Sequence, residues 1–419
     1  YKGIFGTNVA HILRRLKRIL KFYGASPQFI ASSATIKEPE KFAQKLTGEK
    51  FIAITKNGAP SGKKHFIFWD SEVSPYTEVT ELFAECLHYN LKTILFTKSR
   101  RATELISSWI NQKHKEISSK ISSYRAGYLP LERREIEKDL FTGKLKGIIS
   151  TSALELGIDV GELDCCLLLG YPGTITSTWQ RGGRVGRGEK DALIIMIALD
   201  NALDQYFLRH PRDFFSRGWE KIIISVKNEL IASRHLVCAA SEVPLSKEDK
   251  IIYGKNFPFF LDSLEKKGEL FQDKEGEKWY SRKKYPQRKI NIRSIGEAYN
   301  IINLKTNKII GGIDEAKVYY ETYPGAIYLH RMEEFEIINI DETTKCVYAY
   351  PKFVDYYTQS SSWEKIEILS LEEERNMGKF VLCLGKVKVT RQITGFERRR
   401  KYDNSLISEH PLNLPEQSF

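Results

Sequence analysis

GIISTSALELGIDVG, residues 147–161, contains a short apolar run that leads into a polar tip. Such a run is typical of a buried strand in a parallel sheet, and ligands of these sheets lie beyond the carboxyl ends of the strands. Thr151, Gly157 and Asp159 are therefore expected where a nucleotide or a phosphate backbone could lie. The alternative is a surface segment in which Glu155 only caps a helix or forms a surface ion pair.

Apolar strands and helices alternate around this segment, between residues 66 and 210. The expected strands lie at 93–96, near 121, and at 147–151, 165–169 and 192–198. The expected helices run to residue 114, over 131–141 and from residue 178. This alternation indicates an α/β fold in which a parallel sheet is covered by helices on both faces, and a single doubly wound domain is the economical interpretation.

The flanking segments have other patterns. Before this domain, the sequence predicts a helix over 7–22 with a solvated basic face, a short buried strand at 28–32 and a helix at 39–46. After it, the sequence predicts a helix at 226–240 in a small winged-helix-like module, short strands of a small β-barrel at 327–329, 335–338 and 346–350, and a β segment from 381.

The composition excludes several classes of protein. With 42% hydrophobic residues and 14 prolines among 419 residues, the chain can form real cores, which excludes wholesale disorder and collagen-like sequence. The longest fully apolar stretch, 192–199, is too short to span a bilayer, so we expect a cytoplasmic protein without a membrane partner. A net charge of +12 mildly favours polyanionic partners.

The segment QRGGRVGR, residues 180–187, is the most specific local signal. Its glycines allow backbone to approach a ligand closely, and Arg184 and Arg187, three residues apart, can project from one face toward phosphate oxygens. The alternative is a solvated basic helix face. The strand and polar tip that precede this segment favour the phosphate site.

Several motifs together carry a family resemblance. Ser33-Ala34-Thr35 and residues 93–101, 124–127, 151–161 and 180–187 resemble motifs III to VI of superfamily 2 helicases. SRHLVCAASEVP (233–244), IYLHR (327–331) and DYYTQ (355–359) narrow the resemblance to the group of mitomycin repair factor A and the fungal Hrq-type RecQ-family helicases.

This resemblance covers nearly the whole chain and implies its domain order. The implied parts are the rear of a first RecA-like lobe (1–49), a linker (50–70), a second RecA-like lobe (71–210), a winged helix (211–300), a small β-barrel (301–372) and the start of a zinc-binding C-terminal domain (373–419).

The resemblance also implies which residues serve the nucleotide. In such helicases ATP and Mg²⁺ lie between two lobes, and the second lobe supplies arginine fingers. Arg184 and Arg187 would meet the γ-phosphate, Gln180 would help to close the interface, and Asp159 would reach the sugar or the metal shell. Gly157 and Gly183 would complete the cofactor site.

A second set of residues is implied to grip the tracking strand of DNA. This set comprises Thr97, Lys98, Tyr124, Arg125 and Thr151. Ser33 and Thr35 would couple the two sites through their hydroxyls. Each of these polar side chains could instead be a turn or cap residue.

The nucleotide-binding loop of the first lobe is not recognisable here. Residues 58–64, GAPSGKK, have the wrong glycine spacing and lack Ser or Thr after the lysine, and Asp341-Glu342-Thr343-Thr344 is not the Mg²⁺ motif. ATP and Mg²⁺ are therefore expected to bind only with motifs supplied upstream or by a companion chain, and this chain alone is expected to be inactive. Zinc is expected beyond this sequence, and no metal site is expected within it.

The resulting hypothesis is that the chain is part of an ATP-dependent DNA helicase. This helicase would move 3′ to 5′ on single-stranded or tailed DNA and act in DNA repair. Two alternatives stay open. One is a DNA-binding module without motor activity, or one half of a split helicase. The other is an RNA-remodelling helicase.

Overall fold

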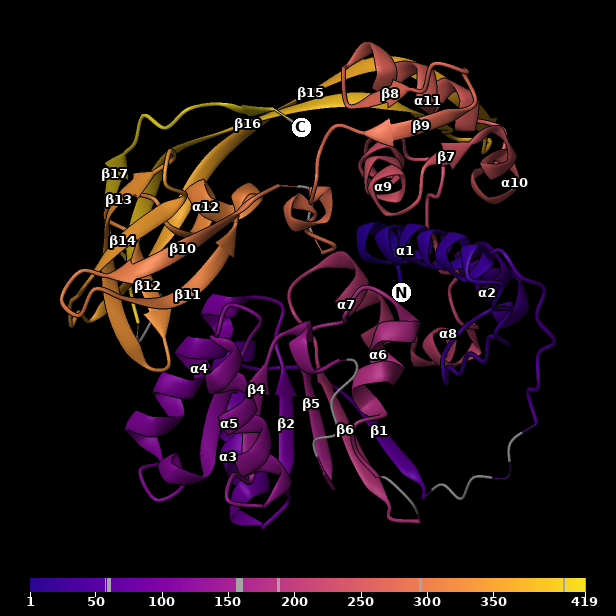
Figure 1. The fold of residues 1–419 in the computed structure, drawn as a ribbon. Helices are drawn as coiled ribbons and strands as arrows, with labels where there is room; N and C mark the ends of the chain where they lie inside the picture. The colour runs from indigo at the N-terminus through magenta and orange to yellow at the C-terminus, as the bar shows by residue number, and fades with distance from the viewer. Residues whose placement is uncertain are drawn as a thin grey trace. The chain divides into compact units, whose positions relative to one another are not determined.

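A computed structural model describes residues 1–56, 58, 62–155, 161–186, 189–293, 296–401 and 404–418 (Figure 1). The chain divides into two compact units. One unit contains residues 1–70 and 170–297, and the other contains residues 71–169 and 298–419. In the described residues, no helix is long and apolar enough to cross a membrane.

A parallel sheet forms the centre of the α/β part. In the second unit, β2 (Thr93–Phe96), β3 (Ile121–Tyr124), β4 (Gly147–Ser150) and β5 (Cys165–Leu169) pair in the order β5-β2-β4-β3. In the first unit, β1 (Lys64–Trp69) pairs in parallel with β6 (Ala192–Ile197). All of these pairings within each unit are parallel, which confirms the predicted parallel sheet.

Helices follow the strands as the alternation predicts. They are α3 (Pro75–His88), α4 (Arg100–Lys113), α5 (Pro130–Phe141), α6 (Ile175–Gly182), α7 (Ala202–Arg209) and α8 (Pro211–Ser216). Their starts have clear local causes: Ser99 caps α4 by accepting from the Ala102 amide, and prolines occupy the first turns of α3 and α5.

Helix α8 lies beyond residue 210, where the second lobe was expected to end. Phe214 is fully buried, and its ring centroid lies 5.2 Å from that of Phe66 on β1 and 5.6 Å from that of Phe207 on α7. This aromatic packing ties α8 to the sheet, so the lobe does not end at residue 210 as predicted but continues through Ser216.

The N-terminal segment contains α1 (Gly3–Phe22) and α2 (Pro39–Thr47), but the strand predicted at 28–32 is absent. Ile30 is 88% exposed. An extended segment needs a neighbouring strand to satisfy its backbone, and none of the described strands pairs with this one.

The basic face of α1 was predicted to be solvated, but two of its arginines are buried. Arg18 Nε donates to Asp249 Oδ1 at 2.7 Å, and Arg18 Nη1 donates to the Ala239 carbonyl at 2.9 Å. Arg14 Nη1 donates to the Leu46 carbonyl at 3.2 Å. Arg14 and Arg18 are both buried, so these charges hold α1 against its neighbours in the same unit.

The winged-helix module predicted after the lobe is present. It consists of α9 (Glu229–Glu242), β7 (Leu245–Ser246), α10 (Lys250–Tyr253), α11 (Phe257–Lys266), β8 (Leu270–Gln272) and β9 (Lys278–Ser281), with the sheet order β7-β9-β8. Its core contains Leu236, Phe257, Phe260 and Trp279.

The remaining strands form two further sheets. The first has the order β11-β10-β14-β13-β12, from β10 (Ala298–Asn303), β11 (Lys308–Asp314), β12 (Ile327–His330), β13 (Glu333–Asp341) and β14 (Cys346–Pro351). Helix α12 (Glu315–Glu321) follows β11. The second contains β15 (Tyr356–Asn376), β16 (Val381–Arg400), β17 (Leu406–Pro411) and β18 (Gln417–Ser418).

Two expectations for this region need correction. The described strands β10–β14 form an open path with β11 and β12 at its edges, not a closed barrel. The boundary expected at residue 372 falls inside β15, which pairs with β16 from Tyr356↔Arg400 to Asn376↔Val381. Ile393 and Phe396 of β16 also lie in the same core as Tyr299 and Phe335, so residues 301–372 are not a separate domain.

Candidate nucleotide and nucleic-acid sites

Helix α6 carries Gln180 on its last turn. The Gln180 side-chain amide Nε2 donates to Thr35 Oγ1 at 3.1 Å, and both residues belong to the first unit. Thr35 is half-buried, whereas Ser33 is exposed. The structure therefore brings one expected coupling residue to the expected interface-closing residue, and it leaves Ser33 apart from this contact.

The start of α6 is held by a carboxylate that sequence reasoning missed. Glu220 Oε1 accepts from the Ile175 amide at 2.6 Å, and Glu220 Oε2 accepts from the Thr176 amide at 2.9 Å and from the Thr176 hydroxyl at 2.6 Å. Burial alone would raise the pKa of Glu220, but these hydrogen bonds outweigh burial and lower it. Glu220 lies 40 or more residues from its partners, so no local pattern reveals its role.

Two glycines of the 180–187 segment are explained by packing. A Cβ at Gly182 would lie 2.7 Å from Ile194 Cδ1. Gly186 has φ +65°, and a Cβ there would lie 2.6 Å from the Ala192 Cβ. Both neighbours belong to β6, so these glycines allow the segment to approach the strand closely.

The remaining expected nucleotide residues have mixed outcomes. Gly183 is exposed at the C-cap of α6, and Arg184 is half-buried directly after it. Gly157, Asp159 and Arg187 lie outside the described residues. The roles expected for this group stay predictions.

The expected DNA-gripping residues follow three neighbouring strands. Thr97 and Lys98 follow β2, Tyr124 ends β3, and Thr151 follows β4. Since β2, β4 and β3 are adjacent and parallel, these residues share the carboxyl edge of the sheet. The topology thus assembles the set that the motifs indicated.

Exposure divides this set. Lys98 is exposed and Thr151 is half-buried, while Thr97 and Tyr124 are each 1% exposed. The Thr97 hydroxyl shares a 2.7 Å hydrogen bond with the Thr103 hydroxyl, and the Tyr124 hydroxyl donates to Glu137 at 2.6 Å. Burial, together with Glu137, raises the pKa of Tyr124. Lys98 and Thr151 are therefore the members of these four that can meet a ligand directly.

Arg125 lies in the protein interior. Its side chain is 1% exposed, and Nε donates to Glu104 Oε1 at 2.8 Å. Nη2 donates to the Leu329 carbonyl at 2.6 Å and to the Tyr328 hydroxyl at 3.1 Å. Burial opposes the charged guanidinium, yet Tyr328 and Glu104 raise the pKa of Arg125. In this arrangement Arg125 cannot reach a DNA phosphate without breaking these bonds.

Aromatic rings complete the surroundings of this ion pair. The Arg125 Cζ atom lies 4.9 Å from the ring centroid of Tyr128 and 5.1 Å from that of Tyr328. The Tyr128 hydroxyl donates to Glu104 Oε1 at 2.6 Å. We call Arg125, Glu104, Tyr128 and Tyr328 the buried arginine network. It joins the loop after β3 and helix α4 to strand β12.

Further contacts join α5 to β12 and α4 to β15. His330 Nε2 lies 3.2 Å from Glu132 Oε1, and Arg101 Nη1 donates to the Thr358 carbonyl at 3.2 Å. The Arg101 Cζ atom lies 5.0 Å from the Tyr357 ring centroid. IYLHR and DYYTQ, which sequence analysis used only for the resemblance, thus contact the sheet domain within one compact unit.

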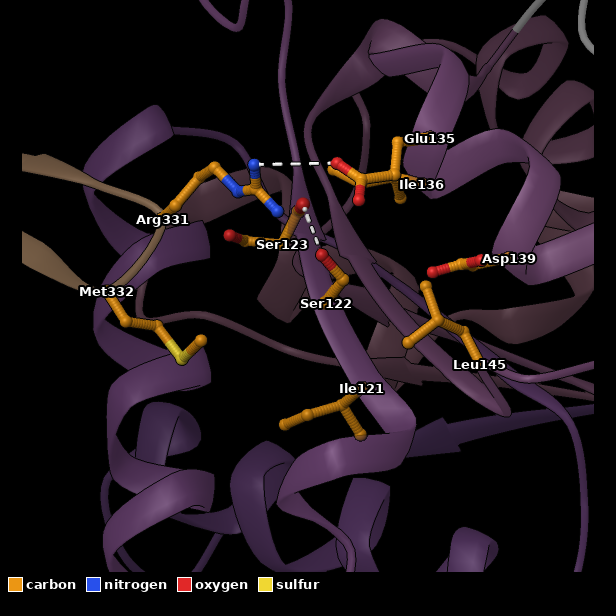
Figure 2. Close-up of a pocket in the computed structure, with 9 residues that line it drawn as sticks. All are labelled: Ile121, Ser122, Ser123, Glu135, Ile136, Asp139, Leu145, Arg331 and Met332. Atoms are coloured by element: carbon orange, nitrogen blue, oxygen red, sulfur yellow. Dashed lines mark hydrogen bonds and ion pairs between the residues drawn. The ribbon is translucent and has the colours of Figure 1, made fainter. Parts of the chain in front are cut away.

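Figure 2 shows a pocket beside this junction, with Arg331 extended toward Glu135. Arg331 Nη1 lies 3.8 Å from Glu135 Oε2. The residues that line the pocket come from three places: β3, helix α5 with the turn after it, and the β12–β13 connection. They are Ile121, Ser122, Ser123, Glu135, Ile136, Asp139, Leu145, Arg331 and Met332. None of the residues expected at the nucleotide or DNA sites lines this pocket.

Two protein-family models match separate parts of the chain. Residues 76–189 match the helicase conserved C-terminal domain, and residues 224–295 match the winged helix domain of the ATP-dependent helicase HRQ1. The first range contains the carboxyl edge of the sheet, and the second contains the winged-helix module.

Longer relatives match the whole chain. The ATP-dependent helicase YprA of Bacillus subtilis is 37% identical over 434 residues, which cover 100% of this chain and 58% of YprA. The ATP-dependent helicase hrq1 of Schizosaccharomyces pombe is 30% identical over 449 residues, which cover 100% of this chain and 42% of hrq1. This chain therefore spans about half the length of these relatives.

Solved structures agree with these relatives. A crystal structure of the DUF1998 helicase MrfA bound to DNA matches with a TM-score of 0.84 and 36% identity, covering 100% of this chain and 58% of MrfA. A crystal structure of MrfA bound to DNA and AMPPNP gives the same TM-score, identity and coverage.

Proposed function

We propose that this chain, a homologue along its whole length of the YprA and Hrq1 ATP-dependent helicases, is part of an ATP-dependent DNA helicase that acts in DNA repair. The observation that carries the proposal is the match of the entire chain to MrfA bound to DNA. Movement from 3′ to 5′ on single-stranded or tailed DNA belongs to the same proposal, as does the cytoplasmic location expected from the sequence.

The chain supplies one side of a nucleotide site in this proposal. The amide of Gln180, the hydroxyl of Thr35 and the guanidinium of Arg184 are hydrogen-bond donors, which suit phosphate oxygens. When bound there with Mg²⁺, ATP would supply a phosphoryl group for transfer to water. By the resemblance, Arg184 and Arg187 would stabilise the charge that develops on that group, and Asp159, Gly157 and Gly183 are assigned to the same site.

Positioning of this donor set begins at the other end of α6. Glu220 holds the first turn through three hydrogen bonds, and Gly182 and Gly186 allow the last turn and the following residues to lie close to β6. A fixed helix keeps the Gln180 amide and the Arg184 backbone in one geometry. Such preorganisation is what a group needs in order to stabilise a transition state more than a ground state.

DNA binding is assigned to the carboxyl edge of the sheet. Lys98 and Thr151 contact backbone phosphates directly, while Thr97 and Tyr124 shape the turns that present them. Contacts of this kind carry no sequence preference, and their affinity falls as salt rises. For Arg125 we replace the expected phosphate contact by a role in positioning the loop after β3.

Steady-state ATP hydrolysis tests the proposal. The chain is joined to a first lobe that carries a phosphate-binding loop and the Mg²⁺ carboxylates, from a close relative, and hydrolysis is measured with and without single-stranded DNA. We expect DNA-stimulated hydrolysis from the joined protein and none from the 419-residue chain alone. Stimulation by single-stranded RNA but not by DNA would favour the RNA-remodelling alternative, and the absence of hydrolysis in the joined protein would contradict the motor assignment.

A further inference from the structure

The end of α3 and the end of α4 bring three metal-ligand side chains together. His88 is the last residue of α3, His114 is the C-cap of α4, and Glu116 follows two residues later. One ligand atom from each lies within 4.8 Å of the other two. His88 Nε2 lies 3.0 Å from Glu116 Oε1, and His114 Nδ1 lies 3.7 Å from the same oxygen.

The orientation of His114 is fixed from its other side. His114 Nε2 lies 3.0 Å from Glu81 Oε2, and the other oxygen of Glu81 accepts from Lys113 Nζ at 2.9 Å. When Nε2 carries the proton and donates to Glu81, Nδ1 presents a lone pair toward Glu116. A carboxylate behind a histidine in this way is the usual outer partner of a metal-binding imidazole.

The separations of the ligand atoms suit a small tetrahedral cation. Zinc–nitrogen and zinc–oxygen bonds of about 2.0–2.1 Å place tetrahedral ligands roughly 3.3 Å apart. The two measured separations from Glu116 Oε1, 3.0 Å and 3.7 Å, lie on either side of that value. The exposed His88 ring can rotate to bring its nitrogen closer to His114.

We propose that His88 Nε2, His114 Nδ1 and Glu116 Oε1 bind one zinc-class divalent cation, with water as the fourth ligand. Two imidazoles favour zinc, nickel or copper over magnesium and calcium, which prefer sets of oxygen ligands. Glu81 is the positioning residue behind His114. The bound ion joins the end of α3 to the connection between α4 and β3, and so braces the strand that carries Tyr124 at its end.

Metal titration of the 419-residue chain tests this site. Zinc chloride is titrated by calorimetry, and cobalt chloride by visible absorption, which reports tetrahedral coordination. We expect one ion per chain, loss of that binding in His88→Ala and in Glu116→Gln, and affinity about 10–100-fold weaker in Glu81→Gln. His65→Ala is the matched control, because His65 is another exposed histidine, 3.6 Å from Asp191, and should bind as the parent does.

Three outcomes would overturn the proposal. They are the absence of binding by the parent chain, parent-like affinity in both His88→Ala and Glu116→Gln, or a sulfur-to-cobalt charge-transfer band that places the ion on a cysteine. Thermal unfolding of each variant without metal checks that it folds. If His88→Ala does not fold, Glu116→Gln decides, because the Glu116 side chain is exposed.

Discussion

The loop after β3 and the end of α6 each carry an arginine, and the two side chains have different surroundings. Arg125 is 1% exposed and lies between a carboxylate, a carbonyl and two aromatic rings. Arg184 is half-buried and follows an exposed glycine at the C-cap of α6. A fully buried guanidinium is suited to hold elements together, whereas a guanidinium that is partly exposed to solvent can be reached by a ligand.

Removing Arg125 should have the largest effect on stability. Arg125→Ala leaves the Glu104 carboxylate buried without its cation, which costs about 3–5 kcal/mol. Urea unfolding of the 419-residue chain, followed by fluorescence, measures this loss. Arg134→Ala is the control: Arg134 is exposed on α5, and its removal should change the free energy of unfolding by less than about 0.5 kcal/mol. An Arg125→Ala chain as stable as the parent would show that the buried arginine network contributes nothing to stability. The structural role that distinguishes Arg125 from Arg184 would then be wrong.

A methyl group at Gly186, in the segment after α6, should lower the free energy of unfolding by an intermediate amount. Gly186→Ala puts a Cβ in contact with Ala192 at a positive φ, and we expect a loss of about 1–3 kcal/mol. Gly218→Ala is the control, since a Cβ there would meet nothing within 4 Å. Equal unfolding midpoints for the two variants would mean that the segment after α6 is not packed against β6 as described.

The smallest effect concerns Glu220 and depends on pH. Glu220→Gln removes a charged acceptor from the first turn of α6, and we expect a loss of about 0.5–1.5 kcal/mol at pH 7. The pKa of Glu220 is lowered in the folded protein, so this stabilisation is present above its unfolded pKa of about 4.3 and disappears as pH falls through the folded pKa.

Unfolding of parent and Glu220→Gln chains at a series of pH values checks this sign. The difference between them should shrink as the solution becomes acidic, and Glu275→Gln, at an exposed turn, is the control. A difference that grows toward low pH would contradict the assigned role of Glu220.

The sequence predicted the elements whose signals are local. β2 and β5 were predicted to the residue because each is a continuous apolar run that is buried along its whole length. The strand expected at 28–32 has a similar apolar run, but a strand forms only where another strand pairs with it. The full length of β15 could not be predicted because most of its 21 residues are exposed, so no buried face marks the strand from end to end.

The roles of charged residues were harder to predict, because their partners are distant in the sequence. Arg18 was assigned to a solvated face, but Asp249, 231 residues away, binds it. The position of Arg125 in its motif indicated a phosphate contact, but Tyr328, 203 residues away, shares its guanidinium. The type of a residue determines which partners are chemically suitable, but only the fold determines which of them lies close enough to bind. The motifs assigned Gln180 to closing the interface and Thr35 to coupling the two sites, but they did not predict the hydrogen bond between these two side chains.

We propose that the segment containing Arg184 serves the nucleotide and not the DNA. ATP hydrolysis and single-stranded DNA affinity, measured together on Arg184→Ala in the protein joined to a first lobe, test it most directly. We expect a hydrolysis rate lower by about 10³–10⁵-fold with unchanged DNA affinity, and little rescue by Arg184→Lys. Hydrolysis at the parent rate with lost DNA affinity would contradict it and would make the segment a DNA-binding patch.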